Sequence, residues 1–277
     1  FMGDHSARQI DTMTLLGNNE VVLGNSFIVM SREEPRQESS PEITRYVRLL
    51  STKAPLFEKV SENTVLVRIP AFDHAFKKDI DAVIAKHLDT ILKTENLIID
   101  IRGNGGGSDV SYASLLPILY TNPIRTVGME YLSTELNNSR MLGFLQNPHF
   151  SEEEKQWAKD GYDILNQHIG SYINIDEDVT VETFDKIEPL PKSIGVLVDS
   201  SNGSTAEQFL LAAKQSKKVK LFGQTTAGVL DISNMYQTDS PSGTFTLYYS
   251  LTKSLRIPHM AIDGVGIQPD YYIDGEL

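Results

Sequence analysis

Apolar side chains recur with two different spacings along the chain, and together they predict a repeated unit of strand, loop and helix. Almost continuously apolar runs, typical of buried strands, lie at Thr64–Ile69, Leu97–Ile101 and Ser193–Val198. After the first run, Asp73 is a good helix N-cap, and apolar residues then follow at spacings of three and four. Alternating strands and helices predict an α/β fold with a largely parallel sheet and helical crossovers.

Two segments fall outside this repeated unit. Residues 1–60 predict a small N-terminal appendage of a hairpin and loops, in which Gly24-Asn25 is the expected turn. Residues 61–277 then form the core. Within the core, residues 128–191 are acidic and partly helical, and we interpret them as an insertion or lid, because long insertions in compact domains are usually functional.

Composition excludes several kinds of site and partner. The net charge of −12 is concentrated between Glu130 and Glu188, which holds 13 acidic and 4 basic residues, and no basic block occurs, so nucleic acid is not an expected partner. The absence of cysteine rules out disulfides, thiolate zinc sites and a cysteine nucleophile. No other metal-ligand motif is present, and no metal is expected. No run approaches the roughly 18 apolar residues of a membrane span.

Ser204 stands where a loop meets a predicted helix, directly after a buried run. Ligands of open α/β sheets bind beyond the carboxyl ends of the strands, where this hydroxyl would lie. The helix N-terminus offers unpaired amides, including that of Thr205, to a developing oxyanion. Serine is also a preferred N-cap, so position alone leaves both a nucleophile and a cap open. The segment lacks the second glycine of the lipase-type G-x-S-x-G elbow.

Gly105, Gly106 and Gly107 lie between a predicted strand and a second helical pattern. Consecutive glycines let the backbone approach a substrate closely, so this run is a candidate substrate-binding loop, with the Gly106 amide as the second oxyanion donor. The dinucleotide fingerprint fails, because Ser108 stands where the third glycine belongs, and no P-loop occurs. A tight turn without a function is the other interpretation.

Three ordered segments resemble the signatures of the tail-specific (C-terminal processing) serine peptidases. They are Leu97-Ile-Ile-Asp-Ile-Arg-Gly-Asn-Gly-Gly-Gly107, Val196-Leu-Val-Asp-Ser-Ser-Asn-Gly-Ser-Thr-Ala-Glu207 and Gly264-Val-Gly-Ile-Gln-Pro-Asp270. The resemblance runs from about Thr64 to Ile273. It implies a crotonase/ClpP-like core, Ser204 as the nucleophile, no cofactor, and a peptide or unfolded protein bound as an extended segment or tail.

The lysine base of many members of that family is missing. Such members carry it in a G-x-x-T-x-G-K segment, and here Val229 occupies the lysine position. The resemblance therefore implies the histidine-base branch, which includes tricorn-like and nisin-resistance proteases. His74, at a predicted helix start that favours neutral imidazole, is the first candidate base, and His259 is the alternative. Asp263 is the candidate acid that orients the base, or else a turn residue.

Two other functions remain open. A non-catalytic, peptide-binding relative would account for the missing lysine, and a base within hydrogen-bond reach of Ser204 would exclude it. A crotonase-type acyl-CoA enzyme also uses two backbone amides as an oxyanion hole, but it needs a positive nucleotide pocket that an acidic chain does not favour. The chain opens at Phe1 without a basic-then-apolar leader, and the resemblance implies export to the periplasm or cell surface with the signal removed. Nothing in the sequence indicates an oligomeric state.

Overall fold

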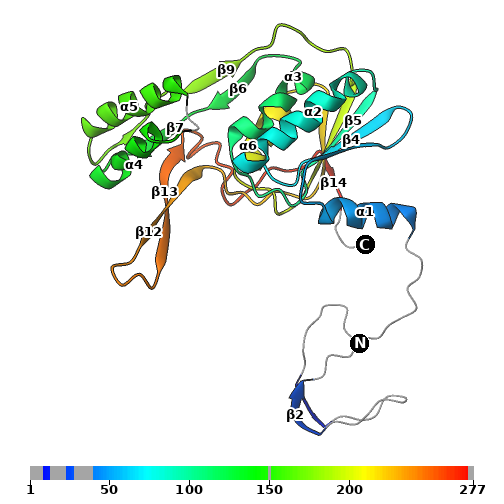
Figure 1. Cartoon of the computed structure of the whole chain (residues 1–277), viewed down its shortest axis with the longest axis horizontal. Helices are drawn as coiled ribbons and strands as arrows, with labels where there is room; N and C mark the ends of the chain where they lie inside the picture. Colours follow the sequence, from blue (N-terminus) through cyan, green and yellow to red (C-terminus); the bar gives the residue numbers. More distant parts are fainter. Residues whose placement is uncertain (1–8, 13–22, 28–39, 149–150, 274–277) are drawn as a thin grey trace. The chain divides into compact units, whose positions relative to one another are not determined.

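The structure, a computed structural model, describes residues 9–12, 23–27, 40–148 and 151–273. The chain divides after Arg48 into two compact units, and each is described by itself (Figure 1). In the first unit, β1 (Gln9–Thr12) pairs antiparallel with β2 (Leu23–Phe27). The predicted turn at Gly24-Asn25 is wrong, because both residues lie inside β2. Helix α1 (Pro41–Ser51), which the sequence did not predict, crosses the division.

The second unit is built on a six-stranded sheet with the order β14-β11-β10-β5-β4-β3. Five of its strands run parallel and only β3 is antiparallel to its neighbour, which confirms the predicted α/β fold with a largely parallel sheet. The strands are β3 (Leu56–Lys59), β4 (Thr64–Arg68), β5 (Asn96–Asp100), β10 (Ser193–Val198), β11 (Val219–Gly223) and β14 (Tyr271–Tyr272).

The unit begins earlier than the boundary placed after residue 60. Strand β3 pairs with β4 in register from Leu56 opposite Arg68 to Lys59 opposite Val65, so residues 56–59 belong to the sheet. The mixed polarity of β3 concealed this, because an edge strand needs no continuous apolar run. The 1–60 segment is therefore not one appendage of hairpin and loops.

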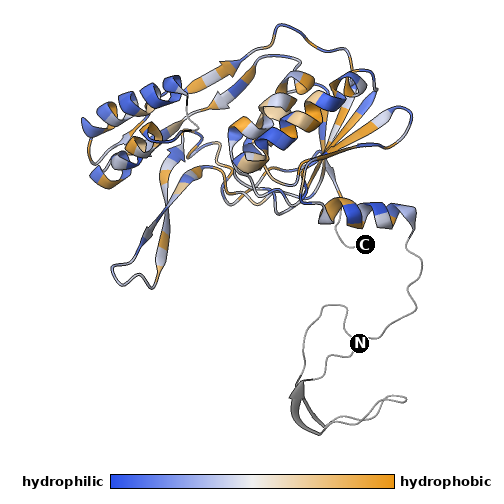
Figure 2. Ribbon diagram, viewed as in Figure 1, coloured by the Kyte–Doolittle hydropathy of each residue, from blue (hydrophilic) through white to orange (hydrophobic). Residues whose placement is uncertain are grey.

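Helical segments connect the parallel strands where the apolar spacing predicts them. They are η1 (His74–Phe76) with α2 (Lys77–Ile91), η2 (Asp109–Leu115) with α3 (Leu116–Leu119), and α6 (Thr205–Ala213). The rings of Phe72, Tyr112 and Phe209 pack against one another with centroids 5.4–5.6 Å apart. Figure 2 shows the apolar strands of the sheet gathered against these helices. This packing supports the loops at the carboxyl ends of the strands.

The acidic segment leaves and rejoins the core through one antiparallel ribbon. Its strands, β6 (Ile124–Val127) and β9 (Val179–Glu182), lie side by side (Figure 1). Between them, α4 (Glu135–Leu145) and α5 (Glu152–Asn166) pack around a small apolar cluster that contains Met141, Ala158 and Leu165. The residues between the two ribbon strands thus have a core of their own, in keeping with an insertion.

A second, four-stranded sheet ties this segment to the C-terminal part of the chain. Its order is β12-β13-β7-β8, and all its pairings are antiparallel. Strands β7 (Met129–Leu132) and β8 (Tyr172–Ile173) come from the acidic segment, whereas β12 (Ile232–Asp239) and β13 (Thr246–Ser254) form a long hairpin. The loop that leads into β12 begins next to the candidate nucleophile, as described below.

Candidate active site

Ser204 lies between the β10 loop and α6 in a backbone conformation that few residues adopt. Its φ is 53° and its ψ is −126°, a strained combination for a residue with a Cβ. Such conformations cost on the order of 1–3 kcal/mol and cluster at active sites, where the surrounding structure holds them in place. The Ser204 side chain makes no capping hydrogen bond to α6. The structure therefore excludes the N-cap interpretation and leaves the hydroxyl available for chemistry.

The glycine run passes directly beside this serine. A Cβ built on Gly106 would lie 2.9 Å from the Cβ of Ser204 and 3.0 Å from the nitrogen of Thr205, and φ at Gly106 is 108°. A Cβ on Gly107 would lie 2.3 Å from the carbonyl carbon of Phe72. Only glycine fits at these two positions. The run is thus a close contact between three chain segments and not merely a tight turn.

The amides near Ser204 differ in whether they already donate a hydrogen bond. The Gly106 N–H donates to Oδ1 of Asn104 at 2.9 Å, so the predicted second oxyanion donor is occupied. Gly107 pairs with Phe72 in a parallel bridge, which turns its own N–H away from Phe72. Within the described part of the chain, the N–H groups of Thr205 and Gly107 donate to no acceptor. Both amides are available to a ligand.

Two buried asparagines fasten the strand ends to one another. Nδ2 of Asn202 donates to the carbonyl of Ile101 at 2.6 Å and to that of Asn104 at 3.0 Å. Nδ2 of Asn104 in turn donates to the carbonyl of Ile69 at 3.2 Å. Because these carbonyls follow β4 and β5, the amides link three loops around Ser204. The sequence analysis missed both residues, although each stands inside one of the quoted segments.

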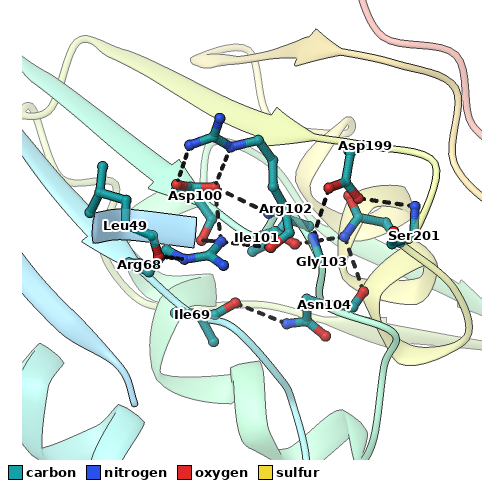
Figure 3. A network of polar contacts seen from close by, with 11 residues as sticks. Leu49, Arg68, Ile69, Asp100, Ile101, Arg102, Gly103, Asn104, Asp199 and Ser201 are labelled. Atoms are coloured by element: carbon teal, nitrogen blue, oxygen red, sulfur yellow. Dashed lines mark hydrogen bonds and ion pairs between the residues drawn. The ribbon is translucent and has the colours of Figure 1, made fainter. Parts of the chain in front are cut away.

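A buried ion network holds the base of the glycine loop (Figure 3). The carboxylate of Asp100 lies 2.7 Å from Nη2 of Arg102 and 3.1 Å from Nη1 of Arg68. Arg68 also donates to the carbonyl of Arg102 at 2.7 Å and, through Nε, to that of Leu49 at 3.0 Å. Asp199 accepts from the amide of Gly103 at 2.9 Å. The network fixes where the loop leaves β5. Arg68 belongs to β4, and nothing in the sequence around it predicts that it takes part in this network.

His74 reaches the same edge of the sheet on a separate element. It opens η1, whose N-cap Asp73 accepts from the amide of Ala75 at 2.8 Å, and its side chain is exposed. Two residues earlier, Phe72 donates to the carbonyl of Gly106 at 3.0 Å. The backbone two residues before His74 thus contacts the glycine run, which passes beside Ser204. His259 is also exposed, after β13.

One residue of the acidic segment, Glu154 in the first turn of α5, interacts electrostatically with His74. Hydrogen bonds from Ser151 lower the pKa of the Glu154 carboxyl, and the positive charge of His74 contributes a smaller lowering. The first turn of α5 is therefore within electrostatic range of the candidate base.

The carboxylate of Asp263 accepts hydrogen bonds from loop amides and from no described histidine. Its Oδ1 accepts from the amides of Leu230 at 2.5 Å and Asp231 at 2.6 Å, and its Oδ2 accepts from that of Ile232 at 3.1 Å. Among the described residues, no histidine bonds to either oxygen. The structure therefore does not bring Asp263 together with His74 in the way that the triad interpretation requires.

The buried carboxylate of Glu207 holds the preceding residues of the same loop. It accepts from the Thr226 hydroxyl, from the Gly228 amide at 2.8 Å and from the Val229 amide at 2.9 Å. This arrangement places Val229 against the residue before the nucleophile, because a Cβ on Gly203 would lie 2.7 Å from Cγ2 of Val229. The position at which a lysine is missing thus packs on the neighbour of Ser204, and it carries an apolar, half-exposed side chain.

Asp109, which the sequence analysis did not single out, carries a perturbed carboxyl close to the nucleophile. Desolvation by the surrounding protein raises its pKa, while a hydrogen bond with the Thr205 side chain and the charge of Arg256 act in the opposite direction. The side chain is nevertheless exposed to solvent. Nothing in the sequence distinguishes this residue from an ordinary acidic residue at a helix start.

The described residues include no group of three or more His, Asp or Glu side chains placed to hold a metal ion. In the same part of the chain, no helix has the length and apolar character needed to cross a membrane.

Comparisons with known proteins agree with this geometry. The chain is 25% identical over 245 residues to an uncharacterized protein of Chlamydia muridarum (strain MoPn / Nigg), with 76% of this chain and 40% of that protein covered. Among solved structures, mature CPAF complexed with lactacystin superposes with a TM-score of 0.54 at 20% identity, over 76% of this chain and 47% of that one. The photosystem II D1 C-terminal processing protease gives a TM-score of 0.46 at 17% identity, over 77% and 43%.

The chain spans less than half the length of each of these relatives. At 20% identity, the structure of mature CPAF shows a shared fold. The family itself is shown by a model described as peptidase family S41, which matches residues 63–273 and so covers every strand of the sheet except β3, together with the glycine run, Ser204 and the loop around Val229. The resemblance drawn from the three sequence segments is confirmed, and the chain belongs to peptidase family S41.

Proposed function

We propose that this chain is a serine peptidase that cleaves peptide bonds through an acyl-enzyme on Ser204. The observation that carries the proposal is the strained φ of 53° at Ser204, held without a capping hydrogen bond beside the unbonded amide of Thr205. Strain of this kind is kept when it has a use, and here it presents a hydroxyl next to a potential oxyanion donor. Family membership supports the same chemistry.

In the proposed mechanism, Oγ of Ser204 attacks the peptide carbonyl carbon while the imidazole of His74 takes the hydroxyl proton. The carbonyl oxygen becomes an oxyanion and accepts from the Thr205 amide and an amide of the glycine run. Gly107 has its amide unoccupied, whereas Gly106 serves only if its N–H leaves Asn104. His74 then protonates the leaving amine as the C–N bond breaks. Water, deprotonated by His74, releases the acid and restores Ser204.

We further propose extended segments or carboxy-terminal tails of proteins as substrates, and export to the periplasm or cell surface as the place of action. Both follow from the family resemblance. Fractionation of the source cells, with the chain detected by antibody, tests the location. A signal only in the cytoplasmic fraction would contradict it.

Labelling with a fluorophosphonate probe, read by peptide mass spectrometry, tests the nucleophile. We expect an adduct on Ser204 in the wild type and none in Ser204→Ala. Ser201→Ala is the matched control, because Ser201 is an exposed hydroxyl of the same loop, and it should label like the wild type. An adduct on another serine would contradict the assignment of Ser204.

A second candidate function is that of a non-catalytic, peptide-binding member of the family. The observation that favours it is Val229, which places an apolar side chain against the residue before Ser204 at the position of the missing lysine. Absence of any adduct in a folded protein that still binds an extended peptide would establish this alternative.

A further inference from the structure

The site next to Ser204 contains a carboxylate that the proposed mechanism does not use. Asp109 follows the glycine run by two residues and opens η2. Its position is fixed by the preceding residue, because the Ser108 amide donates to the carbonyl of Phe72 at 2.9 Å. On its other side, η2 packs against α6, and the Asp109 carboxylate interacts with the Thr205 hydroxyl. The carboxylate therefore lies beside the residue whose amide is the proposed oxyanion donor.

No cation in the part of the chain that the structure describes compensates this carboxylate fully. Among the described residues, Asp109 forms no ion pair, and the charge that it senses is that of Arg256. Arg256 is itself committed elsewhere, since its Nε lies 2.7 Å from Oδ1 of Asp231 and its Nη1 lies 3.4 Å from Oε1 of Gln208. Desolvation raises the pKa of the Asp109 carboxyl although solvent reaches the side chain. An accessible, poorly compensated carboxylate is a place where an added cation gains electrostatic energy.

We propose that Asp109 determines substrate specificity, by binding the ammonium or guanidinium group of a Lys or Arg side chain on the residue whose carbonyl Ser204 attacks. The carbonyl of that residue would accept from the Thr205 amide, and its side chain would extend toward the carboxylate beside the Thr205 hydroxyl. The inference rests on the proposed peptidase function and adds its substrate class.

The charge of the rest of the molecule favours the same substrates. The segment from Glu130 to Glu188 carries 13 acidic and 4 basic residues, and the first turn of α5 lies within electrostatic range of His74. An acidic surface near the site attracts cationic peptides at a distance, and salt screens this attraction. Asp109, in contrast, acts at short range on one side chain. The effect of Asp109 on the preference for Lys and Arg peptides should therefore persist at high ionic strength.

Cleavage of internally quenched peptides that differ only at the residue before the scissile bond tests this role. We expect the wild type to cleave the Lys and Arg peptides with a kcat/KM about 10- to 100-fold above the norleucine peptide, the gain typical of a charge-assisted hydrogen bond. Norleucine keeps the length of lysine without its charge. In Asp109→Asn the ratio should fall to near one, and in Asp109→Lys a Glu peptide should become preferred over the Lys peptide.

Asp89→Asn is the matched control. Asp89 is an exposed carboxylate on α2, 3.8 Å from Lys93, and its removal should leave the preference as in the wild type. Equal cleavage of the Lys and norleucine peptides by a wild type whose Ser204 takes the fluorophosphonate label would overturn the inference and leave the peptidase intact. A preference unchanged in Asp109→Asn would do the same. No label and no cleavage of any peptide would overturn both.

Discussion

The two sides of the candidate active site are built by different means. On the nucleophile side, residues 100–108 and 199–205, backbone packs against backbone, and buried amides and carboxylates fasten every loop. On the base side, residues 73–76, 226–232 and 259–263, His74 stands exposed on a three-residue helix. The carboxylates of Glu207 and Asp263 on this side accept hydrogen bonds from loop amides.

The difference follows from what each partner must do. A nucleophile held at positive φ needs several independent contacts that keep its backbone in that conformation, since the strain would otherwise relax. A general base needs only to reach the proton, and apo geometry at such groups is often loose. Substitutions on the nucleophile side should therefore act through geometry, whereas replacement of the base itself should act through chemistry without affecting the fold.

The largest expected effect is that of His74→Ala on turnover. Loss of a general base lowers rates by roughly 10²- to 10⁴-fold, and because His74 is exposed, the free energy of unfolding should not change. His259→Ala is the matched control and should keep most of the activity. Steady-state kinetics with a quenched peptide and a thermal melt decide the question. The reverse pattern would make His259 the base.

Gly106→Ala should come next, through geometry. The new Cβ would lie 2.7 Å from the carbonyl oxygen of Gly203 and 2.9 Å from Ser204 Cβ, at a φ of 108°. Displacement of the loop from the oxyanion site should slow labelling of Ser204 by about 10²- to 10³-fold, as removal of an oxyanion donor does. Gly105→Ala, whose Cβ would meet nothing closer than 4.0 Å, should label normally. Equal rates in the two variants would refute the close-contact argument.

Asp263→Asn distinguishes a loop-holding role from a triad role. Hydrogen bonds to a charged group contribute about 1.5–3 kcal/mol, so the variant should lose stability of that order in urea unfolding. Its kcat, measured where the protein is folded, should fall less than about tenfold, whereas loss of a triad acid lowers kcat by roughly 10⁴-fold. A large fall in kcat at unchanged stability would restore Asp263 to the catalytic group.

The nucleophile side could be predicted from the sequence because its signals are local. The apolar run Ser193–Val198 has the same first and last residues as strand β10. Ser204 lies at the start of α6, where the apolar spacing predicts a helix. On the base side, the one element with the same kind of local signal is the helix expected after Asp73, which begins as η1 and continues as α2. In each case a strand period, a loop and a helix period follow one another without interruption.

The remaining features depend on residues that meet only in the folded chain. The edge strand β3 has no apolar run, and the pairing of β7 with β13 joins segments more than a hundred residues apart, as in Tyr131 opposite Thr252. The amides that donate to Asp263 and the neighbours of Asp109 are set by loop paths that no local pattern encodes. Individual carboxylates all look alike in a sequence, so their partners could not be assigned from it.

The smallest expected effect is a gain of stability in Asp109→Asn. Because folding raises the pKa of the Asp109 carboxyl, chiefly by desolvation, the ionised group favours the unfolded chain when the pH is above both pKa values. Asparagine carries no such charge, so at pH 7 the variant should be more stable, by less than about 1 kcal/mol because the side chain is open to solvent. The gain should vanish as the pH falls through the raised pKa and the wild-type carboxyl becomes protonated.

Urea unfolding of both proteins at neutral and acidic pH measures this difference, with Asp89→Asn as the control that should show none. A wild type more stable than Asp109→Asn at neutral pH would mean that the carboxylate is already compensated by the hydroxyl of Thr205 and the charge of Arg256. In that case it would have little to gain from a substrate cation. The charges of the nucleophile side would then be compensated within the protein, as its backbone contacts are. A gain of stability in Asp109→Asn would instead show that the Asp109 carboxylate lacks such compensation.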